Sequence, residues 1–133
     1  MNEETTQIDN IAGITGVGLV SCYVDDFQKA LPFYAETLGF TEWDPMGPQA
    51  GAFTVSEATT LFVIGGKKPS SLDGNSIRCT FAFRVNSVSA FTERLRQAGA
   101  TLALDEPMQM NEDTWWIQFH DPAGNLLEAI GGR

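Results

Sequence analysis

Glu128 is the residue with the clearest chemical potential in this sequence. It lies in a strand-like segment, 125–130, at a position that shares its parity with the apolar Leu126 and Ile130. An unpaired carboxylate is costly to bury there, so we expect it to have a partner. Arg84, in another strand-like segment, offers an ion pair or bidentate hydrogen bonds. Glu128 is therefore one half of a structural pair, a ligand-binding or catalytic carboxylate, or a metal ligand.

Aromatic side chains are the second source of chemistry. Trp115 and Trp116 are adjacent in a predicted strand, so they point to opposite faces. Ile117 and Phe119 continue the face of Trp115, which assigns Trp115 to the core and Trp116 to the other face. Aromatic residues on that face could form a pocket that stacks on planar or cationic molecules. The alternative is that they are ordinary core residues. The other candidate members of the set are Tyr23, Phe62 and Trp43.

The histidine, the cysteines and a glycine-rich segment offer less. His120 is the one histidine in the sequence, which weakens any single-chain scheme with two histidines or a Ser-His-Asp triad, and its position favours a turn or surface role. Cys22 and Cys79 lie in apolar strand-like segments, which predicts two buried, reduced thiols. The glycines of segment 13–18 precede a strand instead of linking a strand to a helix, so no phosphate loop is expected.

Length and charge restrict the class of protein. A chain of 133 residues has the size of one domain, and 8 basic against 17 acidic residues give a net charge of −9. This balance argues against nucleic acid and anionic membranes as partners, and it either serves solubility or steers cationic ligands. No segment is apolar over the ~18 residues of a membrane span, and residues 1–10 lack the pattern of a signal peptide. We therefore expect a cytoplasmic protein.

The candidate residues are carried by a pattern of one strand, one helix and three strands that occurs twice. This predicts an α+β fold of two βαβββ modules. Pro32 conflicts with its predicted helix and implies a kink or a later start. In the first module the expected strands are 17–24, 40–43, 52–56 and 59–64, with a helix over 27–38; in the second they are 77–85, 101–104, 115–120 and 125–130, with a helix from Val88 towards Gly99.

Domain organisation follows from the same pattern. Residues 1–10 are expected to form a disordered acidic tail, and residues 65–76, rich in turn formers, a linker. The first module then covers 11–64 and the second 77–131, both within one domain.

Three motifs occur in order along the chain: Val24-Asp25-Asp26 leading into Phe33-Tyr34 and Leu38-Gly39-Phe40, the segment 81–85 (FAFRV), and the segment 119–128 (FHDPAGNLLE). Together they resemble the vicinal oxygen chelate superfamily of glyoxalase I, extradiol dioxygenases, fosfomycin-resistance enzymes and bleomycin-resistance proteins. The resemblance implies a glyoxalase-like fold in which the four strands of each module curl into a half-barrel. It also implies paired modules enclosing a cavity that holds a divalent metal, and a homodimer.

The same resemblance places the metal ligands of the family at four strand positions. Leu19 stands where the family usually has His, and Thr80 where it has His or Gln. Phe62 falls, within one residue, where Glu is common, and Glu128 is intact. Because Leu and Phe donate nothing to a metal and Thr is a weak donor, the usual metal site is predicted to be lost. A divalent metal held by Glu128 remains the alternative.

These observations favour a metal-independent protein, similar to the bleomycin-resistance branch, that binds a small amphipathic or cationic molecule in an aromatic-lined cavity and needs no cofactor. The first alternative is a metal-dependent lyase, isomerase or dioxygenase that uses Glu128 with Gln118, His120 or residues of a partner chain. The second is a module whose cavity is filled by its own side chains. No catalytic residue is assigned. The residues expected to line the cavity are Leu19, Ser21, Tyr23, Phe62, Thr80, Arg84, Trp116, Gln118 and Glu128.

Overall fold

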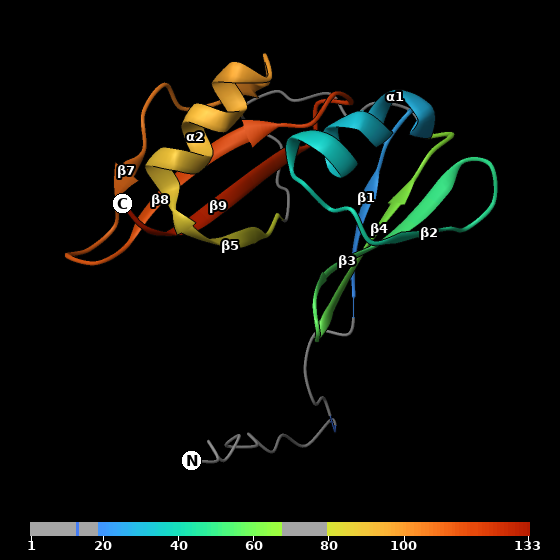
Figure 1. Ribbon diagram of the computed structural model, residues 1–133, viewed down its shortest axis with the longest axis horizontal. Helices are drawn as coiled ribbons and strands as arrows, with labels where there is room; N and C mark the ends of the chain where they lie inside the picture. The colour runs from blue at the N-terminus through green and yellow to red at the C-terminus, as the bar shows by residue number, and fades with distance from the viewer. Residues whose placement is uncertain (1–12, 14–18, 68–79) are drawn as a thin grey trace.

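A computed structural model describes residues 13, 19–67 and 80–133, which form an α+β fold with two mixed sheets (Figure 1). The expected tail, Cys79 and most of the expected linker lie outside the described residues, so the predicted division at 65–76 stays a prediction. The first module comprises the elements from β1 to β4, and the second module comprises those from β5 to β9.

The first sheet has four strands in the order β1-β4-β3-β2, with β1 parallel to β4 and the other pairs antiparallel. Gly51 of β3 lets the helix approach closely, since a Cβ there would lie 2.8 Å from the Phe27 ring. The expected strand over 40–43 begins only at Trp43. The strands are β1 (Val20–Tyr23), β2 (Trp43–Pro45), β3 (Ala50–Ser56) and β4 (Thr59–Ile64).

The second sheet repeats this plan with one addition. Its strands run in the order β5-β9-β8-β6, and β7, a two-residue strand that the sequence did not predict, pairs with β8. Two residues are too few to show an alternating pattern. The strands are β5 (Ala82–Ser87), β6 (Thr101–Leu102), β7 (Met108–Gln109), β8 (Trp115–His120) and β9 (Leu126–Gly132).

The first helix changes its type at Pro32. Helix α1 (Phe27–Pro32) begins at Asp26, whose Oδ1 accepts a hydrogen bond from the Gln28 amide over 3.0 Å. Because Pro32 has no amide hydrogen, it cannot donate to the preceding turn. The chain continues as the π-helix η1 (Phe33–Thr37), in which the Leu38 amide donates to the Phe33 carbonyl over 2.8 Å. The predicted helix over 27–38 is therefore present but divided.

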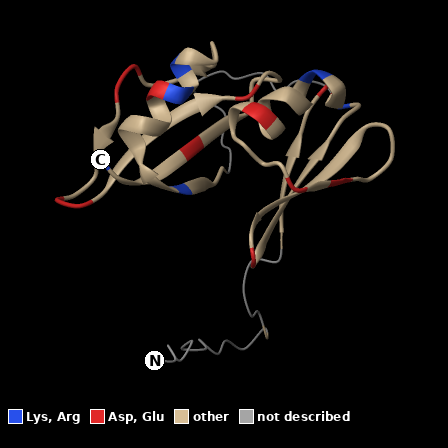
Figure 2. Ribbon diagram, in the orientation of Figure 1, with Lys and Arg blue, Asp and Glu red and all other residues tan. Residues whose placement is uncertain are grey.

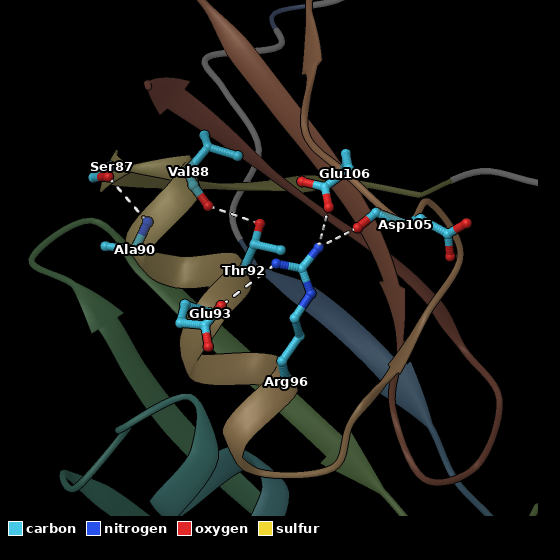
Figure 3. A network of polar contacts seen from close by, with 8 residues as sticks. All are labelled: Ser87, Val88, Ala90, Thr92, Glu93, Arg96, Asp105 and Glu106. Atoms are coloured by element: carbon cyan, nitrogen blue, oxygen red, sulfur yellow. Dashed lines mark hydrogen bonds and ion pairs between the residues drawn. The ribbon is translucent and has the colours of Figure 1, made fainter.

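Helix α2 (Val88–Gln97) is regular and is capped by Ser87, whose hydroxyl accepts from the Ala90 amide over 3.1 Å. Its Val88 and Leu95 are buried, as their helical spacing predicts. On the exposed side, Arg96 contacts Glu93 over 3.4 Å, Glu106 over 2.9 Å and the Asp105 carbonyl (Figure 3). Arg96 thus ties the loop before β7 to the helix.

One hydrophobic core joins the two modules. Phe33 of η1 lies 6.2 Å from Phe119 of the second sheet, and its neighbour Tyr34 lies 5.8 Å from Phe53 of the first. Phe40 contacts both sheets, at 6.4 Å from Phe53 and 5.5 Å from Phe83. Because the helix-covered faces of both sheets converge on this core, we call these the inner faces and the opposite ones the outer faces. No helix in the described part of the chain has the length and apolar composition to cross a membrane.

Candidate functional site

The outer face of the first sheet is largely apolar. In the β1–β4 register Ser21 pairs with Phe62 and Tyr23 with Ile64, and Leu19 shares their parity. Leu19 is 47% and Tyr23 54% exposed, whereas Cys22, between them, is buried on the inner face. Trp43 does not join this face, because it stacks on the buried Phe53 with ring centroids 5.4 Å apart. Strand alternation thus places four expected site residues, Leu19, Ser21, Tyr23 and Phe62, on one surface.

The outer face of the second sheet is more polar. Glu128 of β9 lies between Ala82 of β5 and Gln118 of β8, and the Gln118 amide donates to its Oε2 over 2.7 Å. Trp116 pairs with Ile130 in the next outward-facing row. Gln118, and not Arg84, is therefore the partner of Glu128 in the structure. The register could have been anticipated, because the turn at 121–124 brings Gln118 opposite Glu128 in a hairpin.

The remaining expected site residues, Thr80 and Arg84, line two separate clefts. Ser21, Tyr23 and Thr80 line a cleft of about 270 Å³ between β1 and the start of β9, where the Thr80 hydroxyl donates to the Leu126 carbonyl over 2.6 Å. Arg84 lines a separate cleft of about 470 Å³. Thr80 thus lies beside Ser21 and Tyr23 of the first sheet. The strand registers place Arg84, Trp116, Gln118 and Glu128 on the outer face of the second sheet.

A metal does not fit the four positions that the family resemblance indicates. Leu19 and Phe62 carry no donor atom, the Thr80 hydroxyl already donates to a carbonyl, and the Glu128 carboxylate accepts from Gln118. Within residues 19–67 and 80–133, no three His, Cys, Asp or Glu side chains gather in a way that could hold a metal ion. We therefore assign no metal-dependent step to these residues.

His120 lies at the turn between β8 and β9, as its position in the sequence predicts. Its Nδ1 lies 3.3 Å from the Gly124 carbonyl, a contact that closes this turn. Trp115, as expected, packs against the core and also carries the Arg133 guanidinium 5.0 Å above its ring.

A polar network at the junction of the modules was not predicted from the sequence. Asp121, only 4% exposed, accepts hydrogen bonds from the Tyr34 hydroxyl over 2.7 Å and from the Asn125 amide over 2.8 Å. The Asn125 side chain donates to Asp121 Oδ2 over 2.9 Å and to the Tyr23 carbonyl over 2.8 Å. Asp121 therefore connects the helix of one module with the turn of the other.

Burial at this junction keeps two neighbouring groups neutral. It raises the pKa of the Cys22 thiol to about 11. A hydrogen bond with Tyr34 lowers this pKa somewhat, and the negative charge of Asp121 raises it further. Burial also raises the pKa of the Tyr34 hydroxyl well above its usual value, with Cys22 and Asp121 contributing. A neutral, buried thiol is a poor nucleophile, so Cys22 has no catalytic character.

Charge on the surface is distributed unevenly. Figure 2 shows basic residues on α1, α2 and β5, while acidic residues are spread over many loops and strands. Arg94 of α2 is used at the junction, where it donates to the Thr37 and Glu36 carbonyls over 2.7 and 2.9 Å. It thereby satisfies carbonyl groups at the end of η1.

Two modules of one strand, one helix and further strands, each forming a mixed sheet, define the fold class of this chain. The chain belongs to the glyoxalase/bleomycin resistance protein/dioxygenase superfamily, whose family model matches residues 16–129.

Two relatives and one solved structure agree with this. The Bacillus subtilis protein YetH is 33% identical over 119 residues, which is 86% of this chain and 96% of that protein. The metallothiol transferase FosB of Shouchella clausii is 27% identical over 129 residues, covering 90% and 82% of the two chains. A glyoxalase/dioxygenase structure from Nostoc punctiforme has a TM-score of 0.76 at 15% identity, covering 98% and 99%. This last likeness supports the fold alone.

Proposed function

We propose that this protein binds a small amphipathic or cationic molecule without a metal ion, using the outer faces of its two sheets. The observation that carries the proposal is the donor set: Leu19 and Phe62 are hydrocarbon, and Glu128 is bound by Gln118. Such a surface offers an aromatic wall, a carboxylate and amide groups, which suit recognition of a cation more than activation of a metal-bound oxygen. The cytoplasmic location stays part of this proposal.

The proposal includes a homodimer. The inner faces of both sheets contribute to one core, so Tyr23 and Trp116 lie on the outer faces of different sheets within one chain. A second copy that sets its second sheet against the first sheet would bring these two aromatic residues to one cavity. Leu19 and Tyr23, about half exposed, would then be covered.

Metal content tests the central claim. The experiment is elemental analysis of protein purified without a metal-binding tag, followed by thermal melts with Mn, Fe(II), Ni and Zn after chelation. We expect no stoichiometric metal and no change of melting temperature. About one metal per chain, with a stabilisation that Glu128→Ala removes, would contradict the proposal. That result would instead favour the alternative of a metal-dependent lyase, isomerase or dioxygenase. The likeness to a metallothiol transferase is the comparison that supports this alternative.

Binding is tested with three ligands that share one ring and differ in charge: 2-naphthylmethylamine, 2-naphthamide and 2-naphthoate. We expect the amine to bind, and Trp116→Ala or Tyr23→Ala to weaken it about tenfold, because each removes a stacking face for the cation. Met46→Ala, at a 55% exposed position in the loop between β2 and β3, is the matched control and leaves affinity unchanged. Unchanged affinity in both aromatic variants would exclude these faces as the binding site.

A further inference from the structure

The cleft that Arg84 lines runs along β5, the edge strand of the second sheet, and neither Glu128 nor Trp116 is among its lining residues. It has a volume of about 470 Å³ and opens between the inner face of the first sheet and strand β5 of the second. Volumes of this size are typical of small-molecule sites. Most of its lining is apolar, with hydroxyl groups from Ser56 and Thr59 at the β3–β4 turn. The apolar lining residues are Val20, Val55, Leu61, Phe81, Ala82, Phe83 and Ile130.

Arg84 is the one charged residue among the described residues that line this cleft. Ala82 and Arg84 share the parity of the outer face and Phe83 has that of the inner face, so the cleft extends around the β5 edge and receives Arg84 directly. The aliphatic stem of an arginine can lie along apolar walls while the guanidinium stays at the rim.

Arg84 also differs from the other described arginines in having no partner within residues 19–67 and 80–133. Arg94 donates to two carbonyls, Arg96 binds Glu93 and Glu106, and Arg133 lies over the Trp115 ring. A chain with 17 acidic and 8 basic residues could readily supply a carboxylate to Arg84. Its guanidinium is instead left available beside an apolar cleft.

An apolar cleft with one guanidinium at its rim is complementary to an apolar anion. The planar guanidinium fork matches a carboxylate with two parallel hydrogen bonds. The rings of Phe81 and Phe83, edge to face with centroids 5.1 Å apart, offer an aromatic wall to a flat ligand.

We propose that this cleft is a second binding site, which takes a small apolar carboxylate with its carboxylate on Arg84 and its apolar body between the sheets. The proposal goes beyond the binding of a cation on the outer faces, because it requires the opposite ligand charge and a cleft whose lining includes neither Tyr23, Trp116 nor Glu128. The two proposals therefore succeed or fail separately.

The test uses 2-naphthoate and 2-naphthamide, which have the same ring with and without the charge, in titrations of the full chain followed by fluorescence and by ¹H–¹⁵N NMR. We expect 2-naphthoate to bind at least about tenfold more tightly than the amide, since a hydrogen-bonded charge pair is lost in the amide. Amide shifts should change at Val55 and Phe83, which line the cleft, and stay unchanged at Tyr23 and Gln118, which do not.

Variants of Arg84 separate charge from packing. Arg84→Gln should weaken 2-naphthoate at least about tenfold and leave the amide unchanged, while Arg84→Lys should keep part of the affinity. Lys29→Gln removes one positive charge from the exposed side of α1 and is the matched control, with no effect expected.

Four results of the binding experiments would overturn the proposal. They are the absence of 2-naphthoate binding up to roughly 10 mM, equal affinity in Arg84→Gln, equal affinity for the amide, and shift changes centred on Tyr23 or Gln118. A second copy as the occupant would appear as dimerisation that Arg84→Gln alters in sedimentation, without 2-naphthoate binding, and would also overturn it. Loss of 2-naphthylmethylamine binding would contradict only the proposed function.

Discussion

The two modules share one plan but differ in where they carry charge. At their junction the first module supplies the Tyr34 hydroxyl and backbone carbonyls, and the second supplies Asp121, Arg94 and Asn125, whose polar side chains bind them. The outer faces show the same difference, with Leu19 and Phe62 on the first module and Glu128 on the second. The comparison indicates that the first module provides shape and apolar surface, while the second provides the electrostatics.

Removing Asp121 tests most strongly whether the second module supplies the electrostatics of the junction. In Asp121→Ala the Tyr34 hydroxyl and the amides of the β8–β9 turn lose their buried acceptor, so we expect the free energy of unfolding to fall by about 3 kcal/mol. Urea denaturation measures this change. Asp44→Ala, at an exposed position of the first module, is the control and should change stability by less than about 0.5 kcal/mol. Equal losses in the two variants would refute the special role of the second module.

The pH dependence of stability tests the contribution of the first module, whose buried Cys22 thiol titrates at the junction. Because the Cys22 pKa rises from 9.0 to about 11 on folding, the native state holds its proton where the unfolded state has lost it. This contribution is complete below pH 9 and is lost as the pH rises towards 11. We expect a loss of about 2 kcal/mol between pH 8 and 10.5 in urea denaturation.

Cys22→Ala is the reference for that series, because it removes the thiol that titrates. Its stability should fall less steeply over the same range, with Tyr34 as the remaining buried group at the junction. Parallel curves for the two proteins would show that the thiol is not responsible.

The smallest expected effect compares two arginines of one helix. Arg94→Met removes hydrogen bonds that cross to the first module and should lower stability by about 1 kcal/mol in urea. Arg96→Met removes contacts within the second module only and should instead increase amide hydrogen exchange in residues 103–110. A change of exchange in η1 in both variants, or in neither, would show that the junction does not depend on Arg94.

The strands, and the side chains that share one face of a strand, could be predicted from the sequence because a strand has a period of two residues. The opposite orientations of Trp115 and Trp116, and the common face of Ser21 and Tyr23, follow from alternation alone. Phe62 joins that face through the β1–β4 register, which alternation does not give. Residue type limits each helix cap to two neighbours, Asp25 or Asp26 and Asn86 or Ser87, of which Asp26 and Ser87 accept the capping hydrogen bonds.

The contacts between modules could not be predicted. Tyr34 and Asp121 are 87 residues apart, and no local pattern joins a helix to a distant turn. Pro32 indicates a disturbed helix, but the widened turn that follows also depends on Phe33 and Tyr34 reaching different sheets. The ligand-binding role of the expected site residues stays a prediction, since strand parity fixes a face and not its occupant.

The hydrogen bond from Asn125 to the Tyr23 carbonyl has a consequence for aggregation. Strand β1 is the outermost strand of its sheet, and an open strand edge is a template on which further chains can add strand by strand. The side chain of Asn125 occupies a carbonyl that an incoming strand would need. A residue of the second module therefore helps to keep the first sheet from growing into a fibril.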